Sequence, residues 1–174
     1  NYTSGSTQIV TYEHTDTNGC TAVTGHPISI NAVTSATIDP IANVCVNATG
    51  AVNLVASPIS GMWNVDGASN TGVLSLGALG VGIHTVNYIY TNPKSCLDTA
   101  TKTFEVFDTT QVNIADDQFC QGTSYTYTLP NNWQSYTWNS AAGTNVHTFN
   151  AGGAITVVVK DANNCYTQDE VTLT

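Results

Sequence analysis

The stretch Ile155-Thr156-Val157-Val158-Val159-Lys160, which continues into Asp161-Ala162-Asn163-Asn164-Cys165, decides the fold class of this 174-residue chain. The first part alternates and is rich in β-branched residues, whereas the second part is a turn of Asp and Asn that ends in a cysteine. A run of this kind, bounded by turn residues, is typical of an antiparallel strand. The same order of β run, turn and cysteine recurs at residues 9–20 and 85–96. The chain therefore contains an internal β repeat.

Short alternating runs of Thr, Val, Tyr and Ile extend over the rest of the chain. Gly, Asn, Asp and Pro separate them, and no stretch shows the i, i+3, i+4, i+7 stripe of an amphipathic helix. These observations predict an all-β, antiparallel protein. The expected strands are residues 8–15, 51–57, 84–91, 100–107, 123–129, 154–160 and 170–174, with short tryptophan-bearing strands at 62–65 and 135–139.

The repeat also divides the chain into modules. Cys45 lies 18 residues before Trp63, and Cys120 lies 18 residues before Trp138, so two copies of one unit follow each other. The first residues match only the end of that unit. Short linkers favour end-to-end stacking with neighbouring modules of the same long chain. We expect the C-terminal part of a truncated module at residues 1–33, a complete module at 36–108 and another at 111–174.

The charge balance excludes several classes of partner. The chain has three Lys, no Arg and twelve acidic residues, which gives a net charge of −9 at pH 7. Nucleic acid and anionic membrane surfaces require clustered cations, so neither is an expected partner. No apolar run approaches the length of a membrane span, and we expect no direct membrane insertion.

Five cysteines in a chain with so few charges suggest disulfides and export to an oxidising space. Four cysteines can pair in three ways, and the repeat chooses among them because each complete module owns one early and one late cysteine. We therefore expect bonds between Cys45 and Cys96 and between Cys120 and Cys165. Cys20 is left over, and its expected partner lies upstream of residue 1. A free thiol and a metal site are the alternatives for Cys20.

Catalytic and metal-binding patterns are not evident in the sequence. His14, His26, His84 and His147 occur singly, and no GxSxG, HExxH or phosphate loop is present. We predict no enzymatic activity, no catalytic residue, no metal site and no cofactor. The acidic turns at residues 16–18 and 161–163 have oxygen ligands that suit calcium, but capping of the turn backbone is the favoured interpretation.

The tryptophans fall into two groups. Trp63 and Trp138 occupy equivalent places in the two modules, so both are expected to pack in a core between two sheets. Trp133 lies in a loop, where Pro58 is its counterpart in the other module. An aromatic residue that the scaffold does not require is a candidate contact for a sugar ring or a partner. We therefore expect Trp133, helped by Tyr136, to be the ligand contact.

Three of these segments together resemble a known family. They are Phe119-Cys120-Gln121-Gly122, Ser135-Tyr136-Thr137-Trp138 and Ile155 through Cys165, and they resemble the immunoglobulin-like repeats of giant Bacteroidota cell-surface proteins, which include gliding-motility adhesins and other type IX secretion substrates. The resemblance implies tandem immunoglobulin-like β-sandwich modules at the cell surface. It also implies an O-glycosylation motif, which places candidate glycans on Thr99 and Thr109.

The function expected from these patterns is structural. The chain is expected to be a segment of a large extracellular repeat adhesin, a stalk or surface-contact array in cell adhesion, with surface glycans or the secretion and motility machinery as partners. The alternative is a carbohydrate-binding module of a secreted polysaccharide-acting protein, with Trp133 and Tyr136 as its stacking platform.

Overall fold

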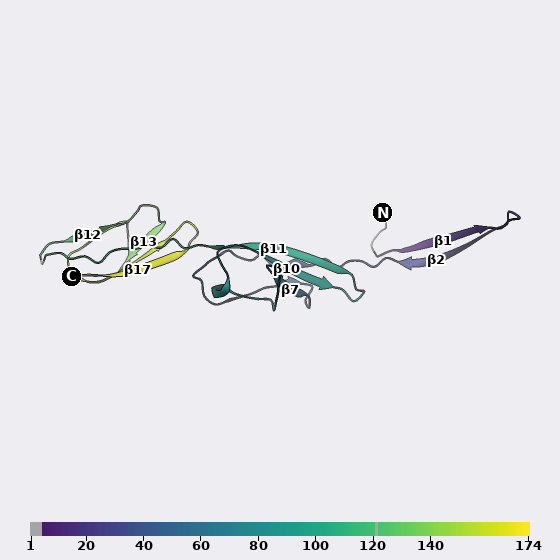
Figure 1. Cartoon of the computed structure of the whole chain (residues 1–174), viewed down its shortest axis with the longest axis horizontal. Coiled ribbons are helices and arrows are strands. Elements are labelled where there is room, and N and C mark those ends of the chain that lie inside the picture. Colours follow the sequence, from purple (N-terminus) through teal and green to yellow (C-terminus); the bar gives the residue numbers. More distant parts are fainter. Residues whose placement is uncertain (1–4, 121) are drawn as a thin grey trace. The chain divides into compact units, whose positions relative to one another are not determined.

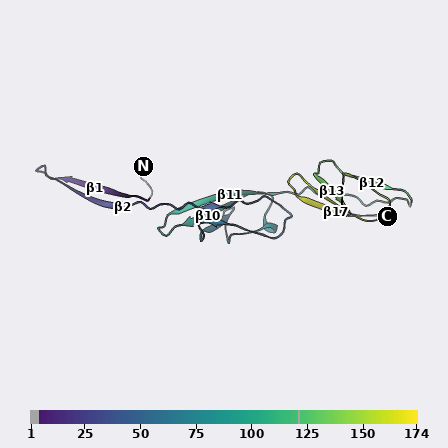
Figure 2. The same cartoon turned by 180° about the vertical axis from the view of Figure 1, so that it is seen from behind.

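The computed structural model describes residues 5–120 and 122–174 and is built almost wholly of β-strands, as Figure 1 and Figure 2 show. This confirms the predicted all-β, antiparallel class. Residues 1–4 of the expected truncated module and Gln121 of the family motif lie outside the described residues. Within the described residues, no helix has the length and apolar character needed to cross a membrane. The elements are β1 (Thr7–Thr15), β2 (Thr21–Ser29), β3 (Thr37–Ile38), β4 (Val44–Cys45), β5 (Ala51–Asn53), β6 (Ala56–Ser57), β7 (Met62–Val65), β8 (Ala68–Asn70), β9 (Val73–Ser75), the 3₁₀ helix η1 (Leu76–Ala78), β10 (Gly82–Thr91), β11 (Leu97–Phe107), β12 (Tyr125–Thr128), β13 (Ser135–Trp138), β14 (Ala141–Gly143), β15 (Val146–Phe149), β16 (Gly153–Lys160) and β17 (Tyr166–Leu173).

The described chain forms two compact units. The first comprises residues up to Ile41, Asn53–Val73 and Thr85–Thr103, and the second comprises Ala42–Val52, Leu74–His84 and Phe104–Thr174. The long strands β10 and β11 contribute residues to both units, and the strand order of their sheet is β4-β11-β10-β7-β8. The module boundaries expected from the repeat stay a prediction.

In the first unit, β1 and β2 form a hairpin whose register runs from Thr7 opposite Ser29 to Thr15 opposite Thr21 (Figure 1). Nearly all of its residues are exposed, including the apolar side chains of Ile9 and Tyr12. The strand β7 instead lies between β8 and β10, with Trp63 opposite Asn70 on one side and Tyr88 on the other. The apolar residues near Trp63 thus find cover that those of the hairpin do not.

The second unit is a sandwich of two antiparallel sheets, β14-β13-β16-β17 and β12-β15. Alternate residues of β16 point inward, so Ile155, Val157 and Val159 are almost completely buried. Trp138 on β13 is 1% exposed and stacks on Tyr127 of the facing sheet, with ring centroids 6.0 Å apart. Packing of inward-facing side chains between two sheets is the arrangement of an immunoglobulin-like sandwich. The prediction that Trp138 fills a core is confirmed.

Three hairpin turns share one hydrogen-bond pattern. In the turn between β16 and β17, Asp161 Oδ1 accepts hydrogen bonds from the N–H groups of Asn163 and Cys165, each 2.8 Å long. Asp16 Oδ1 does the same for Asn18 and Cys20 in the turn between β1 and β2. The capping interpretation of these acidic turns is confirmed, since the oxygen offered to a cation is used by the backbone.

The third turn, between β10 and β11, follows the same pattern with a neutral side chain. Asn92 Oδ1 accepts from the N–H groups of Lys94 and Cys96, at 2.9 and 3.0 Å. A left-handed residue precedes the cysteine in each turn, namely Gly19, Ser95 or Asn164, with φ of 81°, 61° and 66°. The repeat read from the sequence is therefore a repeat in geometry as well.

The disulfide differs from both expected bonds. Cys45 is joined to Cys165, across 120 residues of sequence, while Cys20, Cys96 and Cys120 are free thiols. The expected Cys45–Cys96 and Cys120–Cys165 pairs are therefore wrong.

Strand length is the physical reason for this error. Cys96 directly precedes the eleven-residue strand β11, and Cys45 pairs with the last residue of that strand, Phe107. At about 3.3 Å per residue these positions lie roughly 30 Å apart, whereas bonded cysteines need Cα atoms within about 7 Å. Cys165 likewise precedes β17, while the neighbour of Cys120, Phe119, hydrogen-bonds to Thr174 beyond the far end of that strand. In both cases the early and late cysteines lie at opposite ends of a strand.

The turn geometry yields a prediction for Asp161. Asp161→Ala removes the acceptor of two backbone N–H groups and is expected to lower the free energy of unfolding by roughly 1–3 kcal/mol. Asp161→Asn keeps the acceptor, as Asn92 does in its own turn, and is expected to stay within about 0.5 kcal/mol of the parent chain. Guanidinium unfolding of the oxidised chain measures both. Equal losses in the two variants would show that the charge of Asp161, and not its hydrogen bonds, stabilises the turn.

Candidate functional site

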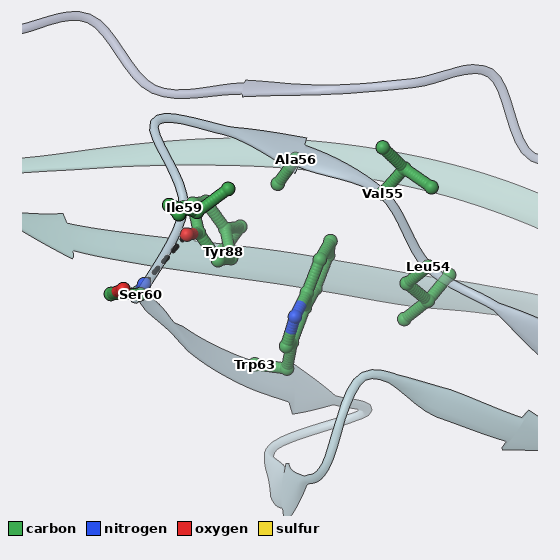
Figure 3. A pocket seen from close by; sticks show the side chains of 8 residues that line it. Leu54, Val55, Ala56, Ile59, Ser60, Trp63 and Tyr88 are labelled. Carbon is green, nitrogen blue, oxygen red and sulfur yellow. Dashed lines mark hydrogen bonds between the residues drawn. The ribbon is translucent and has the colours of Figure 1, made fainter.

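The candidate site is a hollow beside Trp63 in the first unit (Figure 3). Its volume is about 230 Å³. The indole ring of Trp63 stands between the aliphatic side chains of Leu54 and Val55 and the loop that carries Ile59 (Figure 3). The lining residues are Leu54, Val55, Ala56, Ile59, Ser60, Gly61, Trp63 and Tyr88.

The ring of Trp63 is fixed from two sides. Its centroid lies 4.5 Å from that of Tyr88, its cross-strand partner on β10. On the other side is Gly72, which has a φ of +86°, and a Cβ there would lie 2.8 Å from the indole nitrogen. Only glycine combines this backbone conformation with such a close approach. The indole is therefore held in place before any ligand arrives.

Trp63 and Trp138 differ in what their indole nitrogens do. The N–H of Trp138 donates to the carbonyl of Thr144 at 2.9 Å. The N–H of Trp63 has no hydrogen-bond partner among the described residues, where every buried side-chain nitrogen and oxygen does have one. The Trp63 nitrogen is thus open to solvent. The expectation that Trp63 is a core residue is wrong, because this ring is half-buried and lines an open hollow.

Tyr88 holds the loop that forms the wall of the hollow. Its hydroxyl donates to the carbonyl of Pro58 at 2.5 Å and accepts from the N–H of Gly61 at 2.6 Å. A Cβ on Gly61 would lie 2.4 Å from the Tyr88 ring, so the chain can approach the ring this closely only at a glycine. This pair of bonds ties the loop before β7 to the neighbouring strand β10, as the dashed line in Figure 3 indicates.

Tyr136, one of the two expected ligand contacts, plays the equivalent part in the second unit. Its hydroxyl donates to Pro130 O at 2.6 Å and accepts from the N–H of Trp133 at 3.3 Å. Tyr136 is 7% exposed and belongs to the core, and Trp133 packs against that core and is partly buried. The two expected residues do lie together, but Tyr136 has no free ring face to offer a ligand. A stacking platform that includes Tyr136 is therefore ruled out by its burial.

The candidate glycosylation residues differ in exposure. Thr99 is exposed on β11, next to Asp98, whose carboxylate accepts a hydrogen bond from the N–H of Ala36 at 2.7 Å. Thr109 is only 9% exposed, and the Gln111 side chain lies within 3.4 Å of its hydroxyl. Modification of either threonine stays a prediction, and the exposed Thr99 is the more accessible of the two.

An acidic pair next to β12 is occupied by hydrogen bonds of the chain. Asp116 accepts from the N–H of Thr172 at 2.8 Å, and Asp117 accepts from the N–H of Gln118 and from the hydroxyl of Tyr125. The Tyr125 hydrogen bond, followed by that of Gln118, holds the pKa of Asp117 below its ordinary value. Across residues 5–120 and 122–174, no group of three or more His, Cys, Asp and Glu side chains could hold a metal ion.

No protein-family model matches the chain, and no curated protein matches it. One similar solved structure is the *Bacteroides ovatus* mixed-linkage glucan utilization locus protein SGBP-B in complex with a mixed-linkage heptasaccharide, with a TM-score of 0.33 and 14% identity, covering 82% of this chain and 48% of that one. Another is Sidekick-1 immunoglobulin domains 1–4, with a TM-score of 0.32 and 9% identity, covering 99% of this chain and 59% of that one. The chain thus spans about half to three fifths of the length of these structures.

The class that the structure itself defines is an all-β protein with antiparallel, immunoglobulin-like sheets and one disulfide. Its open hollow is lined by one half-buried tryptophan and aliphatic side chains. Sequence reasoning missed this site because Trp63 matches Trp138 in position. The signal that could have revealed it is Gly61, where the other module has the bulky Tyr136 two residues before its tryptophan.

The Asp117–Tyr125 hydrogen bond yields a pH prediction. Tyr125→Phe removes the donor and is expected to raise the pKa of Asp117 toward its ordinary value, as measured by NMR titration of the side-chain carboxyl. Because the folded-state pKa is lowered, the bond stabilises the fold above the unfolded-state pKa of Asp117. This stabilisation is lost as the pH falls through the folded-state pKa.

The matched control is Tyr127→Phe, which removes a hydroxyl that donates to Ala115 O and not to a carboxylate. The control should leave the Asp117 pKa much closer to that of the parent chain. A pKa that stays unchanged in Tyr125→Phe would show that the hydroxyl does not stabilise the carboxylate.

Proposed function

We propose that this chain is a structural segment of a large extracellular repeat adhesin and acts as a stalk or surface-contact array in cell adhesion. The observation that carries the proposal is the disulfide between Cys45 and Cys165, which closes a covalent loop over 120 residues of sequence. Gliding motility and type IX secretion are the context that the family resemblance supplies. The proposal assigns no catalytic step to the chain.

The position of the disulfide suits a load-bearing role. When such a chain is pulled from its two ends, tension passes from Cys45 to Cys165 through the sulfur atoms and bypasses the residues between them. Both tryptophan-bearing strands, β7 and β13, lie inside this loop. They are therefore protected from unfolding by force as long as the bond is intact.

The composition suits an exposed location outside the cell. A disulfide persists in oxidising compartments, which fits an extracellular protein. Three Lys and no Arg leave few sites for trypsin-like proteases, and a net charge of −9 favours solubility of a long array.

Single-molecule pulling of the full chain tests the load-bearing role. Under oxidising conditions, unfolding should release no length from residues 45–165. Addition of a reductant should release up to about 40 nm more, because 120 residues extend by roughly 3.5 Å each. Cys45→Ser should show this extra length without reductant. An equal total extension of the oxidised and reduced parent chain would contradict the proposal.

A second candidate function is carbohydrate binding, and the hollow at Trp63 favours it. A fixed indole face is suited to stacking against the apolar face of a sugar ring, and the solvent-open indole N–H and the Ser60 hydroxyl are polar groups at the same place. This places the ligand contact at Trp63 and not at Trp133 and Tyr136.

Titration with neutral β-linked glucose oligosaccharides, followed by tryptophan fluorescence and calorimetry, tests the second candidate. Trp63→Ala is expected to weaken binding by about tenfold or more, whereas Trp133→Ala should retain it. Ile59→Asp places a charge on the wall at a residue that is 80% exposed, so it should weaken binding without disturbing the core. Absence of binding by the parent chain, or equal losses in the Trp63 and Trp133 variants, would exclude this site.

A further inference from the structure

The free thiol of Cys120 occupies the position that Cys45 occupies in the preceding repeat. Each residue opens a tight turn in which its carbonyl accepts from the N–H three residues later, from Ala48 at 2.9 Å and from Thr123 at 3.0 Å. Each also lies beside the end of a long strand, since Cys45 pairs with the last residue of β11 and Phe119 hydrogen-bonds to Thr174 after β17. Cys45 is bonded, whereas Cys120 is exposed and unbonded.

The free thiol of Cys20 occupies the position of Cys165, the partner of Cys45. Each residue ends a turn in which an aspartate Oδ1 accepts its N–H at 2.8 Å. In each turn the N–H of the aspartate also donates to the carbonyl of the cysteine, at 2.9 Å. Cys20 is exposed at the tip of the β1–β2 hairpin. The two halves of the observed bond are thus both present a second time, as free thiols.

We propose that Cys120 forms a disulfide with Cys20 of a second copy of this chain, in the arrangement that Cys45 and Cys165 adopt within one copy. The inference rests on the proposed function, because it extends the covalent connection of the repeats from within a chain to successive copies. Cys96 ends an equivalent turn but is partly buried, which makes Cys20 the accessible partner.

The chemistry needs an oxidant of the disulfide class, and oxidised glutathione serves. The thiolate of Cys120 attacks one glutathione sulfur, which gives a mixed disulfide and releases one reduced glutathione. The thiolate of Cys20 from the second copy then attacks the Cys120 sulfur and releases the other. Two thiols and one oxidised glutathione thus become one protein disulfide and two reduced glutathione molecules.

The test is oxidation of the concentrated full chain in a glutathione redox buffer, followed by non-reducing electrophoresis and mass mapping of cross-linked peptides. The expected result is a ladder of covalent multimers in which the Cys120–Cys20 peptide pair dominates. Cys120→Ser and Cys20→Ser should each lower the yield of species longer than a dimer by about tenfold or more, while Cys96→Ser should leave it within about twofold. All three thiols are unbonded in the folded chain, so these variants keep the Cys45–Cys165 bond.

Three results would overturn the inference. They are a dominance of symmetric Cys120–Cys120 and Cys20–Cys20 pairs, a ladder that depends on Cys96, and a chain that stays monomeric with glutathione on its free thiols. None of these results affects the pulling experiment, because the covalent loop of residues 45–165 lies within one copy. Failure of the inference is therefore distinguishable from failure of the proposed function.

Discussion

A side-chain oxygen at the first position of each hairpin turn determines where the cysteines of this chain lie. Asp16, Asn92 and Asp161 each use Oδ1 to accept two backbone N–H groups, the second of which belongs to a cysteine. The turn closes on that oxygen, so the cysteine always stands at the start of the returning strand. A neutral amide serves as well as a carboxylate, because only the acceptor is needed. This is why the middle copy keeps its geometry although it lacks the acid of the other two.

The disulfide follows from this placement and from strand length. A cysteine at the start of a long strand cannot reach a cysteine beside the end of the same strand, whatever the repeat suggests. The early cysteine of one repeat therefore bonds to the turn of the next repeat. The bond from Cys45 to Cys165 is joined there by a hydrogen bond from the Asn47 side chain to the Tyr166 carbonyl, at 2.8 Å. Covalent connection between repeats is thus a consequence of where the turn sets its cysteine.

The sequence predicted what depends on local pattern. Alternation gave the strands that became β1, β10, β11, β12, β16 and β17, and the Asp and Asn spacing gave the turns. The disulfide could not be obtained in this way, because pairing depends on which ends of the strands meet in space. The hollow at Trp63 depends on a similar non-local exchange. The tyrosine that ties down the loop comes from β10 in one unit, as Tyr88, and from the tryptophan strand itself in the other, as Tyr136.

That exchange explains why two tryptophans at equivalent sequence positions differ in exposure. In the second unit, Tyr136 on β13 covers the region before Trp138, whose cross-strand partner is the smaller Val157. In the first unit, Gly61 leaves that position empty, and Tyr88 reaches the loop from the neighbouring strand. The side of Trp63 that faces Leu54, Val55 and Ile59 remains open, so a hollow forms.

The hollow and the disulfide are connected through their order along the chain. Residues 54–88, which line the hollow, fall between Cys45 and Cys165 and therefore within the covalent loop. A contact surface in this part of the chain keeps its shape while tension passes through the sulfur atoms. The β1–β2 hairpin, at residues 7–29, lies outside the loop and carries the load directly. A stalk that also touches its surroundings needs this division, because a binding hollow that unfolds under force would release its ligand when adhesion is most needed.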